Sequence, residues 1–288
     1  MTTASEVMES PSVLRRMLDN LASWTAALVR PPRGRAAGAP RTWLPPISRL
    51  AIGAAVTIAV VAIVMVLLDA PAIRHHTDIP RWLVIAFGAI SDFGKSEWFL
   101  VPSGLLLVIV AAAASPAARA RAGRTKYLVL TSLAARLGFV FVAVALPSLF
   151  TTIVKRLIGR ARPVRVEDLH TLIFAPFSWR VEYASLPSGH STTAFAAAVA
   201  LGAVFPRARV VLWVYAALIA LSRVVLTVHY PSDVVVGAVV GAGGALMIRR
   251  WFAARRLAFA LQSDGSVLAL PGPSLHRIKK VARAIVGP

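Results

Sequence analysis

The sequence predicts an all-α fold: a polytopic membrane protein with a six-transmembrane-helix bundle and a short interfacial element after the first span. Hydrophobic residues make up 57% of the 288 residues and charged residues 15%, and the mean hydropathy is +0.71. This balance lies far outside that of soluble domains. Long apolar runs recur along the chain, with arginine-rich loops between them. The absence of cysteine excludes disulfides, thiolate nucleophiles and Cys-ligated zinc.

The first predicted span is Leu50 to Leu68, which contains 19 residues without a charge. At ~1.5 Å per residue this length crosses a hydrocarbon core of ~30 Å. A signal peptide is the competing interpretation. It is disfavoured because the run begins at residue 50 and "DAPAIRHH" follows it, rather than a small-residue cleavage site.

Five further apolar runs complete the predicted bundle: Trp98 to Ala114, Leu128 to Val154, Ser191 to Phe205, Val210 to Val228, and Val234 to Ile248. The run Trp82 to Ile90 is too short to span, so we expect it to be interfacial or re-entrant. These runs place the membrane domain at residues 47–253, after a cytoplasmic segment (1–46) and before a cytoplasmic tail (254–288). In the first segment, the helical spacing of Leu14, Leu18 and Leu21 favours an amphipathic helix on the membrane surface.

Loop charges predict the orientation. Four basic clusters fall on one side of the predicted membrane: seven arginines before residue 50, Arg119 to Lys126, Arg207 with Arg209, and Arg249 to Arg256. The positive-inside rule makes that side, with both termini, cytoplasmic. Membrane topology thus explains most of the +20 charge, and no nucleic-acid partner is expected. The loop between the third and fourth spans is also basic, on the opposite side, and needs another reason.

That loop begins with the first of three chemically distinctive stretches, "KRLIGRARP". Lys155 and Arg162 are seven residues apart, so on a helix they would share a face, with Pro163 marking its end. Two such cations can close on one anion, and the arginine fork matches phosphate oxygens. The plainer alternative is a pair of juxtamembrane charges that bind anionic headgroups.

The second stretch is "PSGH", directly before an apolar helix. The first amides of a helix have no intrahelical acceptor and can hold an anion. Gly189, after Ser188, lets the backbone approach closely, and His190 stands at the same point with an ordinary pKa of roughly 6.5. A helix cap with an incidental histidine is the alternative.

The third stretch, "SRVVLTVHYPSD", contains Arg223, His229 and Asp233. An ionised side chain at a membrane is costly unless it is paired, and His229 is the nearest partner of Asp233 in the sequence. A carboxylate that orients one imidazole nitrogen leaves the other free as a nucleophile. A structural aspartate cap is the alternative.

Together the three stretches resemble the tripartite signature of the type 2 phosphatidic acid phosphatase (PAP2) family, which shares a superfamily with vanadium haloperoxidases. The matching residues are Lys155 with Arg162-Pro163, then Pro187 to His190, and then Ser222-Arg223 with His229 and Asp233. The resemblance covers roughly residues 50 to 250 and points to the membrane lipid phosphatase branch. It implies that His229 is the nucleophile, Asp233 its orienter and His190 the acid for the leaving group. It further implies that Lys155, Arg162, Arg223, Ser188 and Gly189 hold the phosphoryl oxygens, with no metal or cofactor.

The expected function is removal of a terminal phosphate from a lipid phosphate or diphosphate, at the outer face of the cytoplasmic membrane, through a phosphohistidine. The shortage of acidic residues around the motifs agrees with metal-free chemistry. Phosphatidic acid, phosphatidylglycerophosphate, undecaprenyl diphosphate, lipid A and sphingoid phosphates all remain open as substrates, as does the oligomeric state. A vanadate-dependent peroxidase and a non-catalytic lipid binder are the alternatives of other classes.

Overall fold

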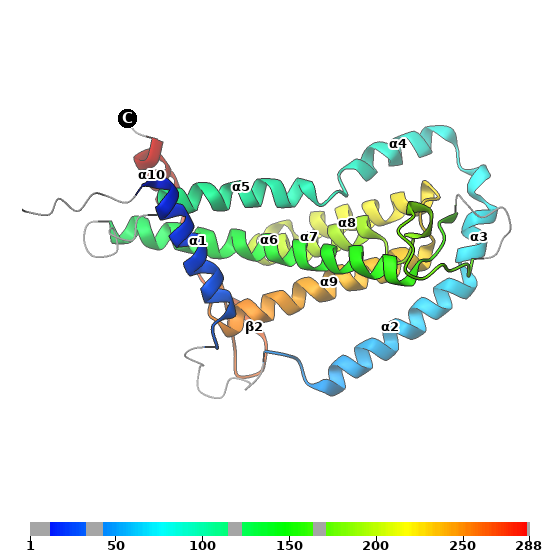
Figure 1. Ribbon diagram of the computed structural model, residues 1–288, viewed down its shortest axis with the longest axis horizontal. Helices are drawn as coiled ribbons and strands as arrows, with labels where there is room; N and C mark the ends of the chain where they lie inside the picture. Colours follow the sequence, from blue (N-terminus) through cyan, green and yellow to red (C-terminus); the bar gives the residue numbers. More distant parts are fainter. Residues whose placement is uncertain (1–11, 33–42, 115–122, 164–170, 287–288) are drawn as a thin grey trace, which may run out of the picture.

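The computed structural model describes residues 12–32, 43–114, 123–163 and 171–286. Residues 33–42, within the N-terminal segment predicted at 1–46, and the basic residues Arg119, Arg121 and Arg165 lie outside these ranges. The described chain is a helical bundle, as predicted (Figure 1). Its α-helices are α1 (Val13–Val29), α2 (Ile47–Leu67), α3 (Asp69–Arg74), α4 (Arg81–Asp92), α5 (Glu97–Ala113), α6 (Arg124–Ile158), α7 (Gly189–Val204), α8 (Arg209–Val225), α9 (Pro231–Ala254) and α10 (Leu275–Val286).

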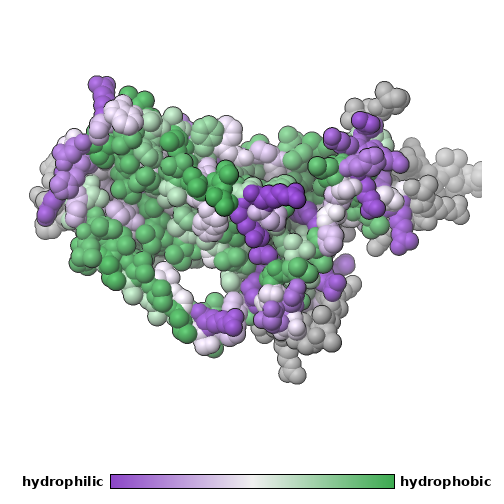
Figure 2. Space-filling view, turned by 180° about the vertical axis from the view of Figure 1, so that it is seen from behind, coloured by the Kyte–Doolittle hydropathy of each residue, from purple (hydrophilic) through white to green (hydrophobic). Residues whose placement is uncertain are grey.

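Five segments of the described residues could cross a membrane by length and composition: Ile47–Leu67, Arg81–Ala113, Arg124–Ile158, Pro206–Val225 and Pro231–Ala254. The shorter apolar α7 is the sixth member of the bundle. The short run predicted to be interfacial or re-entrant falls on α4, which a break near Gly94 separates from α5. By length and composition, however, α4 and α5 count together as the single segment Arg81–Ala113, so an interfacial α4 stays a prediction. A broad apolar surface lies between a hydrophilic edge and the hydrophilic half that holds the termini (Figure 2). The protein is therefore a multi-span membrane protein.

Helix α7 is the centre of the bundle, packed against α6, α8 and α9. Its many alanines are buried, which lets the neighbouring backbones approach closely. The closest approach is to α9, where a Cβ on Gly241 would lie 2.2 Å from the carbonyl oxygen of Thr192, and one on Gly237 2.5 Å from that of Ser188. No larger residue fits these positions without moving α7. The contact therefore holds the first turns of α7 and α9 in a fixed relation.

The ends of the bundle differ. The C-terminal ends of α2, α6 and α8 and the N-terminal ends of α7 and α9 meet at one end, near α3 in Figure 1. At the other end lie α1, α10 and a hairpin of β1 (Phe259–Leu261) and β2 (Val267–Ala269), in a tail to which the sequence assigned no structure. Phe259 packs edge-on against Phe139 of α6, with ring centroids 4.7 Å apart. Asn20 of α1 donates 2.9 and 2.6 Å hydrogen bonds to the carbonyls of Ala111 and Ala114, at the end of α5.

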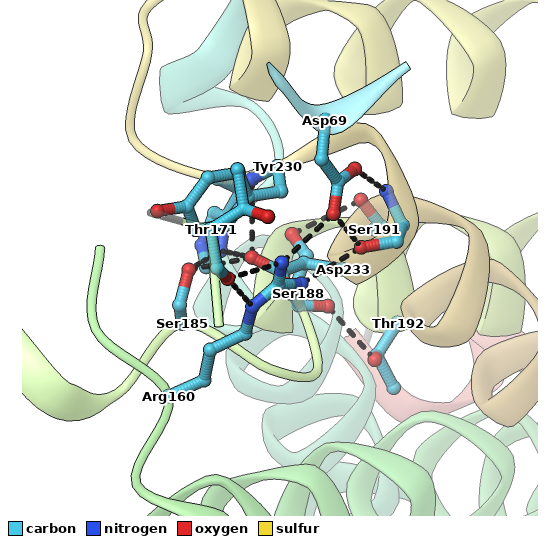
Figure 3. Close-up of polar contacts among 11 residues, drawn as sticks. Asp69, Arg160, Thr171, Ser185, Ser188, Ser191, Thr192, Tyr230 and Asp233 are labelled. Carbon is cyan, nitrogen blue, oxygen red and sulfur yellow. Dashed lines mark hydrogen bonds and ion pairs between the residues drawn. The ribbon is translucent and has the colours of Figure 1, made fainter. Parts of the chain in front are cut away.

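A buried charge cluster joins the elements at the first end. Arg160 follows α6 and is fully buried between Asp69 at the start of α3 and Asp233 in the first turn of α9 (Figure 3). Its Nη1 lies 2.7 Å from Asp233 Oδ1, and its Nη2 lies 2.8 Å from Asp69 Oδ2. Nη1 also donates to Ser232 Oγ, and Nε and Nη2 donate to the carbonyl oxygen of Thr171. All five N–H groups of the guanidinium are therefore used.

We expect Arg160→Met to be strongly destabilising, because it leaves two buried carboxylates without a counter-charge. Removing one partner of a buried ion pair typically costs about 3–5 kcal/mol. Arg156→Met on α6 is the control, because Arg156 donates to two backbone carbonyls at an exposed position, and its loss should cost about 1 kcal/mol or less. Thermal unfolding in detergent, followed by tryptophan fluorescence, measures both. Equal stability of the two variants would show that the cluster does not hold the fold together.

Candidate active site

The first motif does not form one continuous helix. Helix α6 ends at Ile158, and Gly159 adopts the left-handed conformation with φ of 65°. Arg162 lies beyond this turn, where its backbone N–H donates to the carbonyl of Glu182 at 2.8 Å. The expectation that Lys155 and Arg162 share a helical face is therefore wrong. A Cβ at Gly159 would lie 1.8 Å from the carbonyl oxygen of Ala175, so the turn requires glycine.

The second motif is the N-terminus of α7, as the sequence predicts. Ser188 is the N-cap with extended backbone, α7 begins at Gly189, and the first intrahelical bond runs from Thr192 N to Ser188 O. The amides before Thr192 are those that helix geometry leaves without an intrahelical acceptor. Lys155 lies over this turn, because its Nζ is 3.3 Å from where a Cβ of Gly189 would be. The structure thus brings the first two motifs together around an anion-binding helix end.

The third motif joins this helix end through the backbone. Ser188 N donates to the carbonyl of Asp233 at 3.0 Å. His229 is buried, and its Nδ1 lies 3.7 Å from Asp233 Oδ2, slightly beyond hydrogen-bonding distance. Ser185 lies between them, donating to Asp233 Oδ2 at 2.5 Å and lying 3.5 Å from His229 Nδ1 (Figure 3). Because Nδ1 faces these acceptors, Nε2 is the ring nitrogen that points away from the carboxylate.

The environment of His229 keeps its imidazole neutral. Burial lowers the pKa of His229 to about 4, against the opposing effect of Asp233, and the positive charges of Arg223 and Arg162 lower it further. A neutral imidazole has a free lone pair at pH 7, which a nucleophile or base requires. Because their charges lower the pKa of His229, Arg223 and Arg162 both lie close enough to act on it electrostatically.

Two arginines of the site retain donors for a ligand. Arg223, in the last turn of α8, donates from Nη1 to Ser91 of α4. Within the described chain, the Nε atoms of Arg162 and Arg223 are buried without a hydrogen-bond partner. The Nε atoms of Arg16, Arg249 and Arg255, outside the three motifs, are unpartnered as well, so it is the place of Arg162 and Arg223 in the motifs that makes their donors candidates to bind a ligand. Arg223, Arg162 and Lys155 thus offer positive charge to an anion held at the α7 N-terminus.

His190, in the first turn of α7, has different neighbours from those of His229. Its Cδ2 atom lies 2.8 Å from the position that a Cβ on Gly94 would take, so the break between α4 and α5 passes directly beside the ring. The carboxylate of Asp233 lies beside the ring of His229. The two histidines therefore stand in different environments, one in a carboxylate-linked pair and one beside a loop.

Sequence reasoning missed the residues that support Asp233. Its shortest ion pair is with Arg160, and its carboxylate also accepts from the hydroxyl of Ser185 and the backbone N–H of Tyr230. Asp69 could have been found, because an acidic residue at the end of an apolar run needs a buried partner. Nothing in the sequence separates Arg160 from the cations around it or marks Ser185. Among the described residues, no group of three or more His, Asp or Glu side chains is placed to hold a metal ion.

The arrangement of cations, helix amides and a carboxylate-linked imidazole suits the binding of a phosphate and its transfer to nitrogen. The family model described as "PAP2 superfamily" matches residues 136–257, which include all of these groups. A solved structure, the PAP2 type phosphatidylglycerolphosphate phosphatase from Bacillus subtilis, covers 81% of this chain and 94% of its own, with 21% sequence identity and a TM-score of 0.42.

Curated relatives give the same family. The lipid A 1-phosphatase of Rhizobium johnstonii is 35% identical over 215 residues, which are 74% of this chain and 85% of that protein. The lipid A 1-phosphatase of Rhizobium etli is 33% identical over 214 residues, 74% of this chain and 90% of that protein. The lipid A 4'-phosphatase of Bacteroides thetaiotaomicron is 31% identical over 136 residues, 44% of this chain and 59% of that protein. This chain belongs to the PAP2 superfamily and is a membrane lipid phosphatase.

Proposed function

We propose that the protein removes a terminal phosphate from a lipid phosphate or diphosphate through a phosphohistidine on His229. The observation that carries the proposal is the buried imidazole of His229, linked by Ser185 and Asp233 on its Nδ1 side and placed near an anion-binding helix end. In the first step Nε2 attacks phosphorus, the P–O bond to the lipid breaks, and His190 gives a proton to the leaving oxygen. In the second step water attacks phosphorus and gives a proton to the now neutral His190, the P–N bond to His229 breaks, and phosphate leaves.

The charges of the site suit this sequence of steps. Lys155, Arg162 and Arg223 with the α7 amides offset the charge on the non-bridging oxygens. The bound phosphate in turn places negative charge beside His190, which favours the protonated imidazole only when the site is occupied. A protein that merely bound lipid phosphate would need the cations but not the His229–Asp233 pair.

The substrate is a membrane lipid, and the site faces the periplasm or exterior. The relatives named lipid A 1-phosphatases make a lipid A phosphate the first substrate to test, ahead of phosphatidic acid, phosphatidylglycerophosphate and undecaprenyl diphosphate. For the orientation, the support is that Arg207, Arg209, Arg249 and Arg250 belong to the end of the bundle opposite His229, which the positive-inside rule assigns to the cytoplasm.

The two histidines should respond differently to the leaving group. General acid catalysis is typically worth ~10² to 10⁴ in rate. We therefore expect His190→Ala to lose about that factor on an alkyl phosphate and to recover most of it on p-nitrophenyl phosphate, which departs without a proton. His229→Ala should be inactive on both and form no phosphoenzyme, and Asp233→Asn should be a weaker version of it. Steady-state rates and trapping of acid-labile phosphohistidine measure this. A phosphoenzyme in His229→Ala would assign the nucleophile elsewhere.

Activity should survive EDTA, and vanadate should inhibit by occupying the phosphate site. The physical reason is that Asp233, the carboxylate beside His229, and its neighbour Asp69 are already paired with Arg160 and are not free to bind a metal. Phosphate release from a purified lipid phosphate, with and without chelator, measures this. Loss of activity with EDTA and its return with magnesium would contradict a cation-based site.

Sidedness can be tested with single cysteines, because the chain contains none. Ser178 lies in the loop at the active-site end, and Ser263 lies at the exposed turn between β1 and β2. Each is replaced singly, as Ser178→Cys and Ser263→Cys. In intact cells a membrane-impermeant maleimide should label position 178 and not position 263, and both should react after lysis. The reverse pattern would place the active site in the cytoplasm.

A further inference from the structure

A cavity of about 870 Å³ lies toward the end of the bundle opposite the active site, between α5, α6, the end of α7 and the C-terminal tail. None of the described residues of the three motifs lines this distal cavity. Its walls are predominantly apolar and include Phe99, Leu106, Leu137, Val140 and Ile278. Its volume lies within the ~300–1,000 Å³ of pockets that hold ligands. The distal cavity is therefore large enough for a ligand and suits hydrocarbon.

One charged side chain interrupts these apolar walls. Arg136 of α6 is the only charged residue among the described residues that line the distal cavity. Its Nη1 donates to the carbonyl oxygen and the hydroxyl of Ser132, at 3.0 and 2.6 Å, and its Nη2 donates to the carbonyl of Leu270 at 2.7 Å. All three acceptors are neutral. Within the described chain no carboxylate forms an ion pair with Arg136, so its positive charge lacks a counter-charge there.

The guanidinium of Arg136 also keeps donors for a ligand. The three hydrogen bonds use three of its five N–H groups, which leaves Nε and one hydrogen of Nη2. A Cβ at Gly272, which also lines the cavity, would lie 3.2 Å from Nη2 and 3.3 Å from Nε. The missing side chain of Gly272 therefore leaves this edge of the guanidinium uncovered. Two N–H groups on one edge of an arginine match two oxygens of a phosphate.

The depth of Arg136 fits the headgroup layer of the leaflet opposite the active site. Arg136 precedes Lys155 on the same helix by 19 residues, which at ~1.5 Å per residue is about 28 Å. The hydrocarbon core of a bilayer is ~30 Å thick. Because Lys155 lies beside the first turn of α7, Arg136 lies close to where the hydrocarbon of the other leaflet ends. A phosphate at Arg136 would be at headgroup depth, with its acyl chains within reach of the apolar walls.

Exposed cations lie on the elements that supply these walls. The end of α7 lines the cavity with Phe205, and the exposed Arg207 follows in the next turn. Ile278 lines the cavity from α10, where its neighbours Arg277 and Lys279 are exposed. Helix α10 lies at the end of the bundle opposite α3 (Figure 1). Basic residues at the end of a membrane span attract anionic lipids, so the surroundings of the cavity favour a negatively charged headgroup.

We propose that the distal cavity binds one anionic phospholipid of the leaflet opposite the active site, with its phosphate at Arg136 and an acyl chain along α5 and α6. A neutral phospholipid carries its own positive charge beside the phosphate and would compensate Arg136 less well. Because Arg136 also holds the carbonyl of Leu270, the bound lipid would tie the C-terminal tail to α6. Among the described residues no histidine lines the cavity, so the lipid is a bound partner and not a substrate.

Native mass spectrometry of the delipidated protein in detergent, titrated with phosphatidylglycerol or with phosphatidylcholine of the same acyl chains, tests the proposal. Phosphatidylglycerol has no terminal phosphate, so the phosphatase reaction does not consume it. The wild-type protein should bind the first phosphatidylglycerol about tenfold more tightly than phosphatidylcholine. Arg136→Gln should lose this preference, because a tenfold change is the effect of about one charge-assisted hydrogen bond.

Arg124→Gln is the matched control. Arg124 begins the same helix, is exposed and does not line the cavity, so its replacement removes the same charge from the same end of the bundle. This variant should keep the preference for phosphatidylglycerol. Hydrolysis of p-nitrophenyl phosphate in detergent should change less than twofold in every variant, because the cavity is separate from the active site.

Gly272→Val tests the same site with Arg136 in place, and it carries the test if Arg136→Gln does not fold. The backbone of Gly272 is not left-handed, so valine meets no backbone strain there. Its side chain would cover Nε and Nη2 of Arg136, so this variant should also lose the preference. Phosphatidylglycerol should raise the midpoint of thermal unfolding in the wild-type protein and in Arg124→Gln, and raise it less in the two cavity variants.

Three results would overturn the proposal. Equal affinity of the wild-type protein for both lipids would make the cavity a site for acyl chains alone. An unchanged preference in either folded cavity variant would move the anionic lipid to another surface, such as that of α10. Loss of the preference in Arg124→Gln as well would indicate attraction by total charge. None of these results bears on the phosphatase mechanism, and absence of a phosphohistidine would refute that mechanism without touching the lipid site.

Discussion

The burial of Arg160 between two carboxylates is the interaction on which the active-site end depends. Charges inside a bundle are tolerated only when their hydrogen-bonding capacity is used, and here all five guanidinium N–H groups are engaged. The face of the same group stacks on Tyr230, 4.0 Å from its ring centroid. Asp69 also accepts from Ser232 N, which ties α3 to the N-terminus of α9. These contacts fix the position of the Asp233 carboxylate beside His229.

Close helix packing also fixes the position of the first turn of α7 relative to Asp233. Gly237 and Gly241 bring α9 against the backbone of α7, so the turn with Asp233 and the turn with Gly189 are positioned as one unit. Pro147 of α6 lies against Gly244 of α9. This contact also fixes the position of Lys155, eight residues later on α6, relative to α7 and α9. In a bilayer, where apolar surface gives helices little reason to associate, such close contacts are a main source of stability.

Polarity changes along the bundle. Cations and helix amides gather where the spans end, which is where a lipid phosphate would meet water. The register of α6 contributes to this change, because Val140, Ser148 and Lys155 follow one another toward the active-site end. Val140 is buried in the apolar core, whereas Lys155 lies beside the first turn of α7.

The sequence alone determined the helical class, the spans and the chemistry of the motifs, because hydropathy, helix end signals and residue type are local properties. The tertiary structure decided which cation is paired with carboxylates and which keeps an unpaired donor. Arg160 and Arg162 differ by two positions and look alike in sequence, yet the turn at Gly159 buries one against Asp69, 91 residues away, and leaves the other with an unpaired Nε. The same turn separates Lys155 and Arg162, which a continuous helix would have aligned. The pairing of Ser185 with Asp233 is likewise set by packing between distant segments, and no local pattern encodes such a contact.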